Sequence, residues 1–287
     1  MPNVEEKKLR ERAENGDVEA QIELGRLLDK AGQLDEAEKY LRMAADAGNI
    51  KAKWALAPLL YRTERSGEGE KYLREAADAG YVDAQFALGT ILYEENKLGE
   101  SVKYLRMAAE AGHVDAQSVL GQLLDEAGLT GEAEKYYRMA AEAGDADAQG
   151  LLGILLVDSG RLDEAEKYFR MAADAGDPRA MTNLGDLLKE KGQLDEAEKY
   201  WRMAADAGAV FAKHCLGNLF KEKGQLDEAE KYWRMAAEEG EPRAMYNLGV
   251  LFLNDKNLPD EAMKYFRAAA DAGHEGAQRA LKILSGE

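Results

Sequence analysis

A fixed period of 32 residues constrains the fold of this chain more than any other feature of its sequence. Glycines recur at this spacing, and each of the first eight is followed four residues later by an alanine. They are Gly16, Gly48, Gly80, Gly112, Gly144, Gly176, Gly208 and Gly240, and the next, Gly273, comes one residue late. The stretch KEKGQLDEAEKYWRMAA occurs unchanged at 189–205 and 221–237. Self-similarity of this kind indicates stacked repeats rather than a single globular core.

The first half of each repeat has the pattern of an amphipathic helix. In repeat one, Ala20, Leu24 and Leu28 fall on one face at helical spacing. Asp17 can cap the start of this helix, and Gly32 is the residue type that ends a helix in a left-handed turn. We therefore expect a first helix between these two residues, and an equivalent helix in every later repeat.

The second half of each repeat predicts another helix, which runs on to the next glycine of the period. Asp35 and Glu38 have the spacing of a D-x-x-E capping box, and Arg42 follows Glu38 at the favourable spacing of four. Such a helix pair cannot bury its apolar stripe alone, so neighbouring pairs must stack. The sequence thus predicts an all-α, right-handed solenoid. We expect an N-terminal capping helix in 1–16, eight helix-turn-helix repeats over 17–273 and a C-terminal capping helix in 274–287.

Composition argues against several classes of partner and location. The net charge of −17 opposes binding to nucleic acid or anionic lipid, because both require basic surface. No apolar run approaches the roughly 20 residues that span a bilayer, and the first residues lack the apolar core of a signal peptide. The single cysteine, Cys215, excludes an internal disulfide and a multi-cysteine metal site. We therefore expect a cytoplasmic protein without metal or cofactor, and without nucleic acid or membrane as a partner.

The repeated motifs resemble those of the Sel1-like repeat family, a relative of the tetratricopeptide repeat. The resemblance rests on LGxLL in the first helix, EAxKYxRMAA in the second and the linker AGxxxA. It implies a non-enzymatic scaffold for protein–protein interaction, with the first helices lining a concave groove. We expect a monomer that binds a peptide or protein segment in this groove. The regularity of the repeats also leaves a second hypothesis open, namely a designed or structural repeat protein with no evolved ligand.

Side chains that could support catalysis are scattered. His214 and Cys215 are adjacent, and adjacent helical side chains diverge by about 100° and form no dyad. Most of the carboxylates belong to the repeated DEAE block of the second helix, which we interpret as a solvated face. The glycines punctuate helices and do not form a phosphate-binding loop. We expect no enzyme.

Binding specificity is expected where the repeat varies, and three positions of the first helix vary most. In repeat one these positions are Ile22, Arg26 and Asp29, which share one stripe of the helix. In repeats two and three the first and third positions hold large aromatic residues, which are enriched at binding hot spots. We predict an aromatic patch of Trp54, Tyr61, Phe86 and Tyr93 with a polar rim of Lys51, Arg62 and Asp83. The alternative is that these rings pack between neighbouring first helices.

Two further features point to the same helix faces. A secondary group of groove candidates comprises His214, Asn218, Arg243, Tyr246 and Asn247. Three of them, His214, Asn218 and Asn247, resemble part of the carboxylate clamp of tetratricopeptide domains. Charge also divides along the repeats and could orient an extended partner. The acidic set is Asp83, Asp115, Asp125 and Asp147, and the basic set is Arg179, Lys189, Lys213, Lys221 and Arg243.

Repeat two departs from the common pattern. Pro58 stands inside its first helix, where a proline removes a hydrogen bond and clashes with the preceding turn, at a cost of about 3 kcal/mol. Ala57 replaces the framework glycine, and Gly69 replaces a framework alanine. We therefore expect repeat two to be locally distorted.

Overall fold

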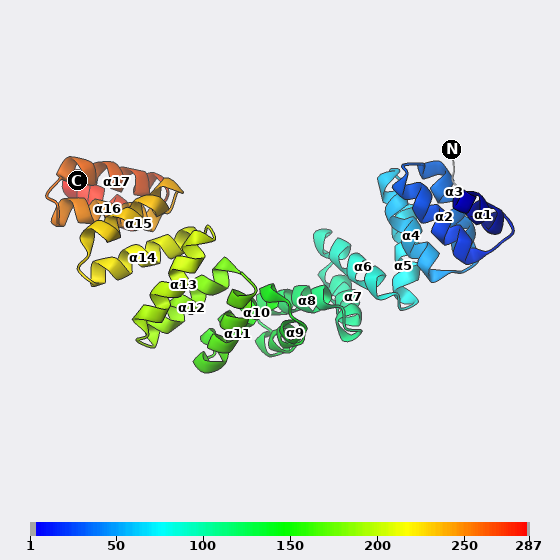
Figure 1. Ribbon diagram of the computed structural model, residues 1–287, viewed down its shortest axis with the longest axis horizontal. Coiled ribbons are helices and arrows are strands. Elements are labelled where there is room, and N and C mark those ends of the chain that lie inside the picture. The colour runs from blue at the N-terminus through cyan, green and yellow to red at the C-terminus, as the bar shows by residue number, and fades with distance from the viewer. Residues whose placement is uncertain (1–3, 286–287) are drawn as a thin grey trace. The chain divides into compact units, whose positions relative to one another are not determined.

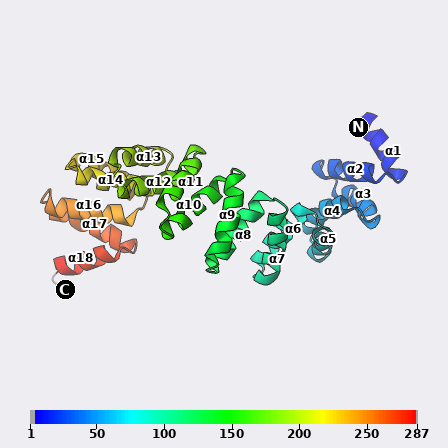
Figure 2. The same ribbon diagram turned by 90° about the horizontal axis from the view of Figure 1, so that it is seen from below.

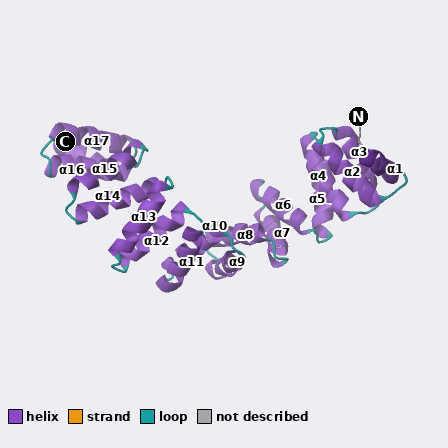
Figure 3. Cartoon of the chain, in the orientation of Figure 1, coloured by secondary structure: helices purple, strands orange, loops and turns teal. Residues whose placement is uncertain are grey.

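The computed structural model describes residues 4–285, and all regular structure in that range is helical (Figures 1 and 3). It contains 18 α-helices, and the chain separates between Ala143 and Gly144 into two compact units. Apart from the two terminal helices, every helix spans 13 residues. The predicted all-α solenoid of helix pairs is confirmed. No described helix has the length and apolar character needed to cross a membrane.

The first unit contains a leading helix followed by four helix pairs, in which each helix packs on its neighbours along the chain. The leading helix is α1 (Val4–Glu14), and the pairs are α2 (Val18–Lys30) with α3 (Leu34–Asp46), α4 (Ile50–Arg62) with α5 (Ser66–Asp78), α6 (Val82–Glu94) with α7 (Leu98–Glu110), and α8 (Val114–Glu126) with α9 (Thr130–Glu142). The repeats predicted as one to four correspond to these pairs.

The second unit contains four more pairs and a closing helix, and Figure 2 shows α16 beside α17. The pairs are α10 (Ala146–Asp158) with α11 (Leu162–Asp174), α12 (Pro178–Glu190) with α13 (Leu194–Asp206), α14 (Val210–Glu222) with α15 (Leu226–Glu238), and α16 (Pro242–Asn254) with α17 (Pro259–Asp271), and the closing helix is α18 (Glu275–Ser285). The even-numbered helices from α2 to α16 are the first helices of repeats one to eight.

The first and second helices of the repeats begin in different ways. The first helix of repeat one begins as predicted, with the Asp17 carboxylate accepting a hydrogen bond from the Ala20 amide at 3.1 Å, whereas Tyr81 and Ala209 at the starts of α6 and α14 make no side-chain capping bond. The capping box predicted for the second helices is wrong. Helix α3 begins at Leu34 after Gln33, whose side chain makes no capping bond, so Asp35 lies inside the first turn. Glu38 instead pairs with Arg42 of its own helix and with Arg65 of the next repeat, at 2.8 and 2.7 Å.

Left-handed residues end the first helices. Gly32 has a φ of +75°, as the sequence predicts for a glycine at a helix end. At the equivalent position repeats two and three carry Glu64 and Asn96, with φ of +58° and +59°. Asparagine tolerates this region far better than glutamate does, so Glu64 is the strained member of the series. Helix α4 nevertheless runs unbroken through Pro58 and has the same length as the other first helices.

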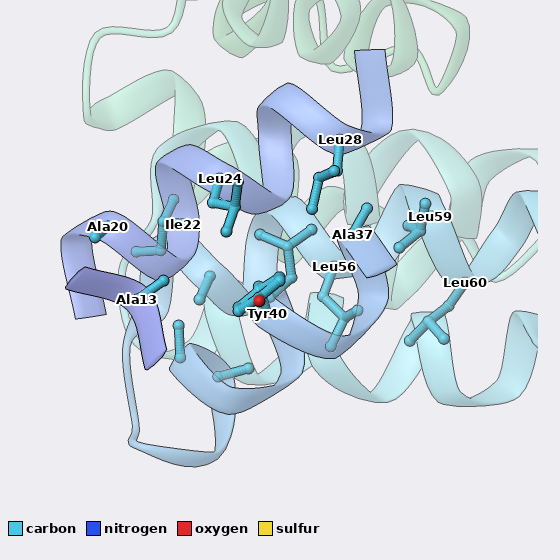
Figure 4. Close-up of a cluster of buried hydrophobic side chains, with 14 residues drawn as sticks. Ala13, Ala20, Ile22, Leu24, Leu28, Ala37, Tyr40, Leu56, Leu59 and Leu60 are labelled. Carbon is cyan, nitrogen blue, oxygen red and sulfur yellow. The ribbon is translucent and has the colours of Figure 1, made fainter. Parts of the chain in front are cut away.

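The core is built from small residues on one helix that receive large residues from its partner. Figure 4 shows the cluster of the first repeats, in which Leu24, Leu28 and Tyr40 are almost completely buried. A Cβ atom added to Gly25 would lie 2.6 Å from the Leu41 side chain, so the helices can approach this closely only at glycine. In later repeats aromatic rings take the place of Leu41 against the equivalent glycines, as Trp201 does against Gly185.

Polar side chains join one repeat to the next. The Gln21 amide donates to the carbonyl of Ala13 at the end of the preceding helix, and Gln85 and Gln117 repeat this contact. On the second helices, Arg42 pairs with Glu68 of the next repeat at 2.8 Å, and its guanidinium also donates to the Tyr72 hydroxyl. The recurring acidic block is therefore part of a ladder of contacts between repeats.

Candidate binding surface

The exposed face of the first helices carries the most varied side chains. Near the start of each first helix, one position is exposed in seven of the eight repeats. Its exposed occupants are Glu19, Lys51, Asp83, Asp115, Asp147, Arg179 and Arg243. The sequence-based charge division holds at this position, and one ion pair, between Arg179 and Asp147, lies where the sign changes.

The four aromatic residues lie on neighbouring first helices of the first unit. Trp54 and Tyr61 are on α4, and Phe86 and Tyr93 are on α6. Tyr93 is exposed over 40% of its surface, whereas the other three are half-buried. Trp54 and Tyr61 also pack against the buried cluster that includes Leu73 and Leu88. The rings are therefore partly available at the surface and partly used in packing.

The half-buried rings contact the residue that starts the next first helix. Trp54 lies 5.8 Å from the Tyr81 ring, and Phe86 stacks on His113 at 4.4 Å between ring centroids. Tyr81 and His113 are the N-cap residues of α6 and α8. The same arrangement recurs in the second unit, where Tyr246 stacks on His274 at 4.6 Å. One edge of each ring is thus committed to joining repeats.

The two remaining tyrosines, Tyr61 and Tyr93, differ in how deeply they are buried. Tyr61 lies against Gly69, where an added Cβ would meet its ring at 3.0 Å. Burial, with a smaller contribution from Glu70, raises the pKa of the Tyr61 hydroxyl above its ordinary value. Tyr93 has no comparable contact among the aromatic pairs of the described residues, and it is the most accessible ring of the four.

The rim residues differ in how freely they can reach a ligand. Lys51 is exposed and lines a cavity of about 460 Å³ beside α2, together with Arg26 and Leu27. Arg62 is exposed but forms an ion pair with Asp29 of the preceding repeat. Asp83 is exposed and lies 4.0 Å from the His113 ring.

The position that begins with Ile22 is more buried than sequence variation suggests. At this position, Ile22, Ser118, Thr182 and His214 are each less than 9% exposed. The interpretation of this position as a freely varying surface is therefore wrong for these repeats. At Trp54 and Phe86 the side chain packs against the residue that starts the next first helix, and His214 lies against Phe211 and the Asn247 amide. The partner of Trp54 and the partner of Phe86 each lie 27 residues further along the chain, and the sequence pattern of the first helix does not indicate them.

The structure brings the secondary group together as an internal hydrogen-bond network. The Asn247 amide donates to Asn218 Oδ1 at 2.8 Å and lies 3.2 Å from His214 Nε2. Asn218 Oδ1 also accepts the indole N–H of Trp233 at 3.1 Å. Burial lowers the pKa of His214, whose Nδ1 is buried without a hydrogen-bond partner among the described residues. These amides already satisfy one another.

The other two members of the secondary group lie beside this network. Arg243 is exposed and stacks over the Phe211 ring at 5.3 Å. Tyr246 is half-buried between the rings of Phe266 and His274. A cavity of about 440 Å³ is bordered by Phe211, Arg243 and His274.

Lys213 does not belong to the exposed basic set, which corrects the sequence-based assignment. It occupies the position of Gln21 in repeat one, is 6% exposed and pairs with Glu239. Glu239 lies at the end of α15, the second helix of the same repeat, and Lys53 at this position in repeat two pairs with Glu75 of α5 in the same way. Among the described residues, no cluster of three or more histidine, cysteine or acidic side chains has the arrangement of a metal site.

Paired antiparallel helices joined by short turns, with glycine and alanine at the close approaches, define a helical repeat protein of the solenoid class. The tetratricopeptide repeat profile matches residues 55–115, 151–210 and 216–277, and a second profile of that repeat matches 18–47. The Sel1 repeat profile matches 130–145. The chain belongs to the tetratricopeptide repeat family and is a Sel1-like repeat protein, as the sequence motifs predict.

Two solved structures show the same fold. One is c5321 of uropathogenic Escherichia coli, a protective antigen displaying an SLR fold; it is 25% identical, with a TM-score of 0.79 over 98% of this chain and 67% of that chain. The other is a Sel1 repeat protein from Oxalobacter formigenes, 24% identical, with a TM-score of 0.75 over 99% of this chain and 91% of that chain. No curated protein sequence matches the chain. Tetratricopeptide and Sel1 repeat proteins typically serve as non-enzymatic scaffolds for protein interaction.

Proposed function

We propose that this protein is a non-enzymatic scaffold that binds a peptide or protein segment on the exposed faces of its first helices. The observation that carries the proposal is the aromatic patch of Trp54, Tyr61, Phe86 and Tyr93, which lies on adjacent first helices and remains partly exposed. Aromatic rings offer large contact area with few rotatable bonds, which suits a recognition surface.

The chemistry of the patch favours a segment with apolar anchors. Trp54 and Tyr61 are seven residues apart, as are Phe86 and Tyr93, so each helix presents two rings about two turns apart. Lys51 and Asp83 supply charges of both signs at the edge. An amphipathic helix or an extended segment would place its apolar side chains between these rings and its polar groups at the edge.

The ring contacts within the protein decide which substitutions test the proposal cleanly. Alanine at Trp54 or Phe86 would remove a contact between repeats as well as a binding contact. Other repeats provide replacements that the fold already accepts: isoleucine at the Trp54 position, serine at the Phe86 position and aspartate at the Tyr93 position. We therefore choose the triple variant Trp54→Ile, Phe86→Ser and Tyr93→Asp.

The experiment is selection of binders from a displayed peptide library, followed by affinity measurement on purified wild type and triple variant. We expect peptides rich in apolar anchors, with affinity falling at least 30-fold in the variant, since one true hot spot is worth about 2 kcal/mol. A control variant, Lys71→Gln on the outer face of α5, should bind as the wild type does. Failure to select any binder, or equal affinity for the triple variant, would support the alternative of a repeat protein without an evolved ligand.

A further inference from the structure

A cavity of about 220 Å³ lies between the first helices α10 and α12 of the second unit. Its walls are Ile154 and Val157 from α10 and Asn183, Asp186 and Leu187 from α12, and Phe169 of α11 also lines it. We call it the Asn183 cavity. The volume lies below the roughly 300–1,000 Å³ of sites for whole small molecules, so the cavity suits one side chain of a partner.

Comparison with the next helix pairs explains why this groove stays open. Between α14 and α16, Asn247 donates to Asn218 at 2.8 Å and bridges the two helices. Asn183 is the equivalent of Asn247, but the residue that faces it in the position of Asn218 is Ile154, which cannot accept a hydrogen bond. The Asn183 amide therefore makes no hydrogen bond to another described residue. A polar group is left facing a cavity with apolar walls.

All the charged side chains that line the cavity are acidic. Asp158, Asp186 and Glu190 all line it, and Asp158 and Glu190 are exposed and have no basic partner among the described residues. The neighbouring Lys189 is engaged with Glu222 of the next repeat at 2.6 Å. None of the residues that line the cavity is basic, and the charge of Lys189 acts on Asp186 from outside it.

Asp186 is the best placed of these carboxylates. Its Oδ1 accepts the Trp201 indole N–H at 3.1 Å and lies 3.6 Å from Cys215 Sγ, which fixes the side chain. Its Oδ2 has no hydrogen bond within the described residues and is open to a ligand. Burial raises the pKa of Asp186, and its contacts with Cys215 and Trp201 and the charge of Lys189 oppose this shift in part.

We propose that the Asn183 cavity binds an arginine side chain presented by a protein or peptide partner. The aliphatic stem packs between Ile154, Val157 and Leu187, while the guanidinium donates to Asp186 Oδ2 and to the Asn183 side-chain oxygen. Arginine fits better than lysine because its planar group carries several donors and is less strongly hydrated, while both can bury their stems on apolar surface. This site is separate from the aromatic patch, so its test does not depend on the function proposed above.

The test is an NMR titration of the isotope-labelled full chain with N-acetyl-arginine N-methylamide at millimolar concentrations. We expect saturable shifts of the Ile154 and Leu187 methyl groups and of the Asn183 side-chain amide, which weaken as salt is raised. The isosteric, uncharged citrulline compound should bind at least 10-fold more weakly, and the lysine compound should also bind more weakly. No shift at these residues, or equal shifts with citrulline, would overturn the proposal.

Two variants separate binding from folding. Asp186→Asn copies Asn218, which accepts the Trp233 indole at the same 3.1 Å, so the fold should persist while arginine affinity falls at least 10-fold. Ile154→Asn restores the partner of Asn183 and should close the cavity without changing its charge. The matched control is Asp195→Asn, an equal charge change on the exposed start of α13. Binding that survives both cavity variants, or that Asp195→Asn weakens equally, would mean that general charge attraction and not this cavity is responsible.

Discussion

The ion pair between Lys213 and Glu239 gives the sharpest test of how the two helices of one repeat are held together. The Lys213 side chain is 8% exposed, whereas Glu239 is 44% exposed. The lysine is shared only with Lys53 of repeat two, and the glutamate differs from the residue that most repeats carry at its position. Repeats six and eight carry Met181 and Met245 at the lysine position, and most other repeats carry alanine at the glutamate position, as at Ala207. Both ends of the pair can thus be replaced by residues that the fold already accepts.

Removing one partner at a time should give opposite results. Glu239→Ala leaves a buried ammonium without its carboxylate; breaking a fully buried pair costs about 3–5 kcal/mol, and exposure of the glutamate reduces this to about 2 kcal/mol. Lys213→Met replaces the buried charge by an apolar side chain and leaves only a surface carboxylate unpaired. Such replacements are often neutral or stabilising, so we expect a change between zero and a gain of about 1 kcal/mol.

The assay is urea unfolding monitored by circular dichroism. The free energies of unfolding are compared between variants whose slope of free energy against urea concentration is the same. The double variant Lys213→Met, Glu239→Ala should be as stable as Lys213→Met alone, which gives a coupling energy of about 2 kcal/mol between the two sites. A neutral Glu239→Ala would show that Lys213 does not need the pair. A loss of more than 1 kcal/mol on Lys213→Met would refute the argument that desolvation offsets most of the attraction.

Two further predictions concern single residues. Glu64→Gly should raise the free energy of unfolding by about 1 kcal/mol, because it removes a left-handed glutamate, and Asn96→Gly should gain less; equal gains in urea unfolding would contradict the assignment of strain. Burial lowers the folded pKa of His214, and Glu241 opposes this shift while Arg243 and His274 add to it. The unfolded chain therefore binds more protons below about pH 6.5, and the share of stability due to His214 is lost as the pH falls from there through the folded pKa. His214→Thr, which copies Thr182, should flatten the dependence of unfolding free energy on pH in that window, and an unchanged profile would show that His214 has no part in it.

The fold could be predicted because the features that define it are local and repeated. Gly32 ends a helix and Asp17 starts one through contacts within a few residues, and a period of 32 repeats them along the chain. The capping box failed for an equally local reason. Helix α3 starts at Leu34, one position before Asp35, so the carboxylate is already helical and cannot cap its own turn. Patterns alone fix helix starts only to within a residue or two.

The binding surface was harder to predict because burial depends on residues one repeat away. Variation at the Trp54 position looks like freedom from packing, yet the ring meets Tyr81, 27 residues later. Lys213 has the sequence signature of a surface charge, and only the position of Glu239 explains how it is buried. The Asn183 cavity likewise depends on two helices together. Asn183 of α12 faces Ile154 of α10, which cannot accept a hydrogen bond from it, and the sequence of either helix by itself does not show this.

The contacts of Trp54 and Phe86 have a consequence for binding in the proposed patch. Each ring uses one edge to hold the start of the next first helix and leaves the rest partly exposed. A segment that covers the exposed part would also restrict the motion of that helix start, since the ring would be fixed from both sides. Because stability in a repeat array is close to a sum over neighbouring interfaces, a ligand there adds to the interfaces of α4 with α6 and of α6 with α8. Binding at the proposed patch would therefore be coupled to local stability through the same two rings. For this reason substitutions at these positions must preserve the contact between repeats if they are to report on recognition alone.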